Sequence, residues 1–138
     1  PQVDVFDYRQ LVAGVGAIRW DYTSSSGKVI VTDPNASVGT VWFGPYKYFT
    51  PGNYSSSFKI KTTNETTHLM LDVTTNLGID IVAKRTVNGS DFKRIDSWQE
   101  FTLYFRIEEL TLLEFRGTCL SNNTQVAVDF VEVTQVNP

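Results

Sequence analysis

The sequence has one cysteine, one histidine and one methionine among its 138 residues. Cys119 therefore has no partner for a disulfide within the chain, and a zinc site made of several cysteines is excluded. The single His68 excludes any site that needs two histidines from one chain. No apolar run approaches the roughly 20 residues needed to cross a bilayer. The net charge of -3 gives no excess of positive charge for binding nucleic acid.

Residues typical of β-strands are abundant instead. The chain has 16 Thr, 16 Val, 9 Phe, 6 Tyr and 3 Trp. Turn signals such as Pro51-Gly52 separate segments in which apolar and polar residues alternate. In one of them, Phe101, Leu103, Phe105 and Ile107 lie on one face. Sheets with one buried and one wet face have this pattern.

The pattern predicts an all-β fold, an antiparallel two-sheet β-sandwich without helices. The predicted strands are 3–8, 16–22, 28–32, 38–43, 54–62, 67–74, 79–86, 99–107, 111–118 and 125–135. No repeat or linker divides the chain, so residues 1–138 are predicted to form a single domain. Because the sequence opens at Pro1 without an initiator methionine, signal peptide or anchor, we expect a piece excised or processed from a larger extracellular or membrane-anchored protein.

Five Asn-x-Ser/Thr sequons occur, where the serine and threonine content predicts roughly 1.3 by chance. They begin at Asn35, Asn53, Asn64, Asn88 and Asn122, all in predicted loops or loop edges. Such triplets are acceptors for N-linked glycans, so we expect a glycoprotein outside the cell or on its surface. The alternative is that a chain rich in asparagine and threonine forms these triplets without using them.

Catalysis has little support in the sequence. Acid–base chemistry needs two titratable groups that converge from different elements. Glu108 and Glu109 are adjacent, so they point to opposite faces of a strand. No serine has a Gly-x-Ser-x-Gly context, and His68 is the one candidate base. We predict that the chain is not an enzyme; a small glycan-active enzyme is the remaining catalytic alternative.

One segment resembles a known family. It has a strand that ends in Gly44-Pro45-Tyr46, a short apolar link, Pro51-Gly52-x-Tyr54 and a further strand. This order is similar to that of galactose-binding-like β-sandwiches of the carbohydrate-binding-module type, and the similarity continues through 98–105 and 128–133. The resemblance implies a jelly-roll fold and a carbohydrate ligand. Modules of this kind are found in ectodomains of membrane glycosyltransferases and in other surface proteins of archaea and bacteria.

Aromatic side chains near this segment are candidates for sugar binding. Trp42 is out of phase with Val41 and Phe43, so its ring faces away from the core if those two are buried. Tyr46 and Tyr48 follow, and flat exposed rings stack on the apolar faces of sugars. The alternative is that these aromatics fasten the link to the sandwich.

The resemblance also implies a ligand site at the loop edge, between aromatic rings and an amide. Asn122 and Asn123 would supply the amide, and Phe92 would stand where relatives carry a second tryptophan. Trp98 precedes an alternating strand and is expected to close one end of the core; the alternative is that its ring stacks on a sugar.

Modules of this type often hold one structural calcium ion between the first and last strands. Asp129 matches the acidic position of the last strand, and Asp4 or Asp7 could supply the opposite side. The alternative is that these carboxylates bind no metal, because no ligand loop is visible.

These observations predict a non-catalytic, extracellular carbohydrate-binding accessory module of a larger envelope protein, with a glycosyltransferase ectodomain as the suggested parent. Its partner would be a glycan or glycoconjugate, with no nucleic acid and no membrane insertion by this segment. The alternative is a glycosylated structural subunit of a surface layer or filament that self-associates through sheet edges, with segment 3–8 donated to a neighbour.

Overall fold

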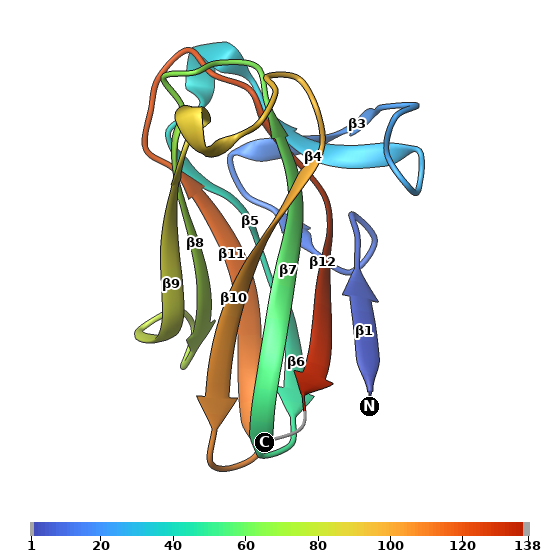
Figure 1. The fold of residues 1–138 in the computed structure, drawn as a ribbon, viewed down its shortest axis with the longest axis vertical. Helices are drawn as coiled ribbons and strands as arrows, with labels where there is room; N and C mark the ends of the chain where they lie inside the picture. The colour runs from blue at the N-terminus through green and yellow to red at the C-terminus, as the bar shows by residue number, and fades with distance from the viewer. Residues whose placement is uncertain (1, 137–138) are drawn as a thin grey trace.

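Two antiparallel six-stranded sheets face each other in the computed structural model, which describes residues 2–136 (Figure 1). The first sheet has the order β10-β7-β12-β4-β3, and β1 also pairs with β12. Its strands are β1 (Val3–Phe6), β3 (Gly16–Trp20), β4 (Lys28–Thr32), β7 (Gly52–Thr62), β10 (Gln99–Ile107) and β12 (Val126–Val136). The predicted β-sandwich is confirmed.

The second sheet has the order β2-β5-β11-β8-β9, and β6 also pairs with β11. Its strands are β2 (Val12–Ala13), β5 (Gly39–Phe43), β6 (Pro45–Phe49), β8 (His68–Thr75), β9 (Asp80–Asn88) and β11 (Thr111–Cys119). The helical elements described are two three-residue 3-10 turns, η1 (Pro34–Ala36) and η2 (Gly89–Asp91). Within residues 2–136, no helix is long and apolar enough to cross a membrane.

Alternating side chains fill the space between the sheets. Phe101, Leu103, Phe105 and Ile107 of β10 are all buried, as their spacing predicts. Phe115 of β11 packs at their centre, with its ring centroid 6.1 Å from that of Phe105. Burial of this apolar surface is the main force that holds the two sheets together.

The strand predictions differ from the structure mainly around turns. The chain leaves the sheet after Phe6 because the carbonyl of Asp7 accepts hydrogen bonds from the backbone N–H groups of Gln10 and Leu11, which form a turn. Strands β2 and β6 were not predicted. Strand β6 begins at Pro45, inside the Gly44-Pro45 turn signal, and its side chains do not alternate between buried and exposed, since residues 46–48 are all exposed.

Candidate functional site

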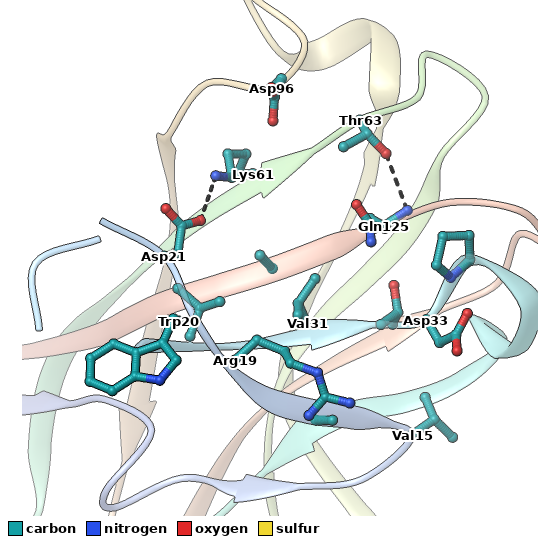
Figure 2. Close-up of a pocket in the computed structure, with 15 residues that line it drawn as sticks. Val15, Arg19, Trp20, Asp21, Val31, Asp33, Lys61, Thr63, Asp96 and Gln125 are labelled. Carbon is teal, nitrogen blue, oxygen red and sulfur yellow. Dashed lines mark hydrogen bonds and ion pairs between the residues drawn. The ribbon is translucent and has the colours of Figure 1, made fainter. Parts of the chain in front are cut away.

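An open cleft of about 520 Å³ lies over β3, β4, β12 and β7 (Figure 2). Its floor consists of small apolar side chains, namely Ala17, Val31 and Ala127 from three neighbouring strands, with Val29 on the same face of β4 as Val31. The neighbours of these residues in sequence, such as Ile30 and Val128, are buried in the core. Because side chains alternate along a strand, the cleft is on the outer face of the first sheet.

Charged side chains stand over one side of this floor. The ammonium of Lys61 lies 2.6 Å from a carboxylate oxygen of Asp21, and both side chains are largely buried. The same ammonium lies 4.7 Å from the ring centroid of Trp98, whose indole N–H donates to Thr23 Oγ1 at 2.9 Å. The loop that joins β3 to β4 is thereby tied to β7 and to the segment before β10. This wall of the cleft is preorganised.

The carboxyl of Asp21 is held in its charged form. Burial by itself would raise its pKa, but hydrogen bonds from Lys61 and Thr23 outweigh burial and lower the pKa below its ordinary value. At neutral pH this carboxylate is therefore ionised, and its partner Lys61 keeps the wall close to neutral overall.

Hydrogen-bonding groups complete the rim. Thr63 and Gln125 lie side by side, since the N–H of Gln125 donates to Thr63 Oγ1 at 3.3 Å and the N–H of Thr63 donates to the carbonyl of Gln125 at 3.2 Å. Asp96 stands above Lys61 in Figure 2, and Asp33 lies at the far end. Amide, hydroxyl and carboxylate groups therefore surround an apolar floor.

Trp20 and Arg19 are cleft residues that the sequence analysis missed. Trp20 is 76% exposed at the end of β3, and Lys28 Nζ lies 4.5 Å from its ring. Figure 2 shows the indole at one end of the cleft, extending away from Lys61 and Gln125. A signal was available, because Trp20 is followed by a polar segment, Asp21 to Gly27, that ends in a Ser-Ser-Ser-Gly turn, and a tryptophan at such a strand end has little core to enter.

Trp42 is fully buried, so its predicted exposure is wrong. Its ring lies over Gly117, where an added Cβ would meet the ring atoms at 2.1–2.4 Å, and packs against Phe58 at 6.4 Å. Val41 is buried as well, because β3 and its preceding loop cover the other face of β5. Because both faces of β5 are covered, neighbouring side chains that point to opposite faces are both buried. The alternation between Val41 and Trp42 therefore does not make Trp42 exposed.

Phe92 is also buried and packs against Phe101 with ring centroids 4.9 Å apart. It therefore offers no face to a sugar, contrary to the prediction. Trp98, expected at one end of the core, is half-buried and packs against the Lys61 ammonium; it does not itself line the cleft.

Tyr46 and Tyr48 are exposed but lie on the second sheet, in β6. Burial raises the pKa of Tyr46 above its usual value, and a hydrogen bond with Glu114 raises it further. Tyr46 also packs edge-on against Phe43 at 6.2 Å. The contacts of Tyr46 fit the alternative that this residue fastens the link to the sandwich, whereas Tyr48 is 62% exposed.

Asn122 and Asn123 lie in the loop between β11 and β12, and both are exposed. The carbonyl of Asn123 accepts a hydrogen bond from Asn64 Nδ2 at 3.4 Å. Neither residue lines the cleft. The structure therefore does not gather the six predicted sugar-binding residues into one site.

The carboxylates predicted to hold calcium each have a basic partner. Asp4 is 2.7 Å from Lys47, and Asp7 is 2.6 Å from Arg9. The fully buried Asp129 accepts hydrogen bonds from the backbone N–H and hydroxyl of Ser25 and lies 3.2 Å from Lys59 Nζ.

These surroundings do not fit a calcium ion shared by the three carboxylates. The Lys59 ammonium already neutralises Asp129. Across residues 2–136, no group of three or more His, Cys, Asp or Glu side chains could hold a metal ion. Calcium binding stays a prediction from the resemblance alone, and the basic partners of the three carboxylates argue against it.

No family model and no curated protein matches the chain. Solved structures do match. A family 35 carbohydrate-binding module from Clostridium thermocellum is 12% identical, with a TM-score of 0.69 over 99% of this chain and 100% of that one. The C-terminal CBM6 of the Zobellia galactanivorans laminarinase LamC is 11% identical, with a TM-score of 0.66 over 97% and 100%.

A third match is the CBM6 of Cellvibrio mixtus lichenase 5A, solved in complex with cellotriose. It is 7% identical, with a TM-score of 0.67 over 97% of this chain and 98% of that one. At these identities the likeness concerns the fold. This chain has the jelly-roll β-sandwich fold of carbohydrate-binding modules.

Proposed function

We propose that the chain is a non-catalytic carbohydrate-binding module and that the cleft on its first sheet holds the glycan. The observation that carries this proposal is the combination of an apolar floor with a polar rim. A sugar ring has apolar C–H faces and a rim of hydroxyl groups, so such a cleft is complementary to it.

The contacts follow from the geometry of the cleft. Ala17, Val31 and Ala127 would take the C–H face of a sugar ring, since small side chains leave room for it. Asp96 and Gln125 would bond to hydroxyl groups, with the carboxylate accepting and the amide both donating and accepting. The Trp20 ring, at the open end, could stack on a neighbouring sugar unit of a longer glycan.

The charge of the cleft favours a neutral glycan. Arg19 and Lys61 stand against Asp21, Asp33 and Asp96, which leaves no surplus of positive charge. Binding a polyanionic glycan would cost the desolvation of its charged groups, and the cleft has no surplus basic side chain whose ion pair would offset that cost. The lichenase module with this fold was solved with cellotriose, a neutral glucan, and this supports the same class of ligand here.

The proposed module belongs to a larger protein outside the cell. The five sequons and the resemblance to surface-protein modules support an extracellular accessory domain of a larger envelope protein, such as an archaeal or bacterial membrane glycosyltransferase. The chain would bring glycans to its parent or anchor the parent to them.

The filament subunit remains the second candidate, and its strand exchange has a structural cost. The segment expected to be donated forms β1, which pairs with β12 of the same chain from Val3↔Thr134 to Phe6↔Val131. Phe6 is buried against Phe115 with ring centroids 6.0 Å apart. Donation would require these contacts to break and re-form between copies. Sedimentation velocity distinguishes the two, because a binding module stays monomeric.

A glycan array followed by calorimetry tests the binding function. Labelled wild-type protein should bind a set of neutral glycans, and Gln125→Ala and Asp96→Asn should each weaken binding about tenfold or more, since each removes one or more hydrogen bonds at a desolvated site. Tyr104→Ala is the matched control, because Tyr104 is 74% exposed on β10 and is not a cleft residue. Unchanged affinity in both cleft variants would overturn the assignment of the site.

A further inference from the structure

The five sequons of the chain have very different surroundings in the folded structure. N-glycosylation joins the side-chain amide nitrogen of asparagine to the anomeric carbon of a lipid-linked glycosyl diphosphate. The bond from that carbon to the diphosphate oxygen breaks, the diphosphate leaves with the electron pair, and the amide nitrogen gives up one proton to a base of the transferase. The transferase must reach both the asparagine and the hydroxyl two residues later.

Two sequons have a buried hydroxyl. Ser37, the hydroxyl residue of the Asn35 sequon, is 2% exposed and donates to the carbonyl of Ser121 at 2.7 Å. Thr124, the hydroxyl residue of the Asn122 sequon, is 1% exposed, and its hydroxyl bonds to that of Thr67. A transferase can reach neither hydroxyl until this part of the fold opens.

Two further sequons begin at a residue of a paired strand. Asn53 lies in β7 between two partners, opposite Arg106 of β10 on one side and Val136 of β12 on the other. Asn88 pairs with His68 at the end of β9, and its Oδ1 lies 2.7 Å from His68 Nδ1. The whole Asn53 sequon lies in β7, so it cannot enter an active site without breaking ladder hydrogen bonds. In the Asn88 sequon, Gly89 is buried and its N–H donates to the carbonyl of Thr67 at 2.8 Å, so this backbone must also open before a transferase can bind it.

The Asn64 sequon is different, because it lies in the loop between β7 and β8. Glu65 and Thr66 are exposed. The polar groups of Thr66 bond within the sequon, its N–H at 2.9 Å and its hydroxyl at 2.8 Å from Asn64 Oδ1. The side-chain nitrogen of Asn64 has one long contact, 3.4 Å to the carbonyl of Asn123. The backbone carbonyls of Asn64 and Glu65 pack on Gly89, but no residue of this sequon lies in a paired strand and its hydroxyl is exposed.

We infer that Asn64 is the site at which the folded chain accepts an N-linked glycan, and that Asn35, Asn53, Asn88 and Asn122 are closed in the folded state. This inference does not depend on the carbohydrate-binding function. Asn64 directly follows Thr63, which lines the cleft, so a glycan attached there begins beside the rim of the cleft. Figure 1 shows this loop at the end of the sandwich where η1, η2 and the loop before β12 gather.

Glycan transfer in vitro tests the inference. The unmodified protein, purified in folded form from a host that lacks N-glycosylation, is incubated with a solubilised single-subunit oligosaccharyltransferase and a lipid-linked oligosaccharide. Intact mass and peptide mapping then report each site. We expect one added glycan, at Asn64, with the other four sites modified about tenfold or more slowly, since each needs local opening.

Matched variants and an unfolded sample serve as controls. Thr66→Ala should abolish the addition, and Thr66→Ser should retain it, while Thr124→Ser should change nothing in the folded sample. In urea-unfolded protein diluted briefly into the assay, Asn35 and Asn122 should gain glycan. The inference is overturned if folded protein is not modified at Asn64, or if any of the other four sequons is modified as fast as Asn64.

Discussion

A methyl group added at Gly117 tests the burial of Trp42, the residue whose placement departs most from the sequence prediction. A Cβ at this position would lie 2.1 Å from one carbon of the indole and 2.4 Å from two others. All three atoms belong to the six-membered ring, and Trp42 is fully enclosed, so the ring has no open space to enter. Overpacking of this kind costs typically 1–3 kcal/mol. We expect Gly117→Ala to lower the free energy of unfolding by about 3 kcal/mol, at the upper end of that range.

Urea unfolding at 25 °C, followed by circular dichroism, measures this change. Thr118→Ala is the control, because its neighbouring position on β11 is only half-buried. Trp42→Phe shortens the ring, so the double variant Gly117→Ala/Trp42→Phe should be more stable than the sum of the two single changes predicts. Additive losses, or a loss below about 0.5 kcal/mol for Gly117→Ala, would refute the stated packing of Trp42 on Gly117.

Three further predictions follow from the ion pairs. Lys59→Met should destabilise the fold by about 3 kcal/mol, because it leaves the buried Asp129 carboxylate without its cation; an unchanged urea midpoint would contradict this. The lowered pKa values of Asp7 and Asp21 mean that their contribution is present above the unfolded pKa, near 3.9, and is lost as the pH falls through the folded pKa. Asp21→Asn should therefore flatten the acid limb of a stability–pH profile, and an unaltered limb would count against the Lys61 pair. Calcium or EDTA should leave the melting temperature unchanged, since basic groups already neutralise Asp4, Asp7 and Asp129; a rise with calcium would show an ion site.

The β-sandwich could be predicted because the alternation of apolar and polar residues within each strand is visible in short stretches of sequence. The alternation in 101–107 fixes which face of β10 is buried, and the same two-residue period identifies most of the other strands. The burial of Trp42 could not be predicted, because it depends on Gly117, a residue 75 positions away that leaves room for the indole.

The cleft could not be predicted either, because its residues are far apart in the sequence. Its floor joins Ala17, Val31 and Ala127, which become neighbours only when β3, β4 and β12 pair. Small apolar residues in strands carry no signal of a site by themselves. Trp98 was noticed, but its position behind Lys61 depends on contacts with Lys61 and with Thr23 of the β3–β4 loop.

Mapping a bound glycan onto the sandwich tests the central claim most directly. Isotope-labelled protein is titrated with a neutral oligosaccharide selected on the array, and backbone amide shifts are followed by NMR. The account predicts saturable shifts concentrated at Ala17, Val31, Gln125 and Ala127, with the amides of Tyr46 and Tyr48 unmoved. Shifts centred on Tyr46 and Tyr48, or no saturable shifts with any neutral glycan, would contradict it.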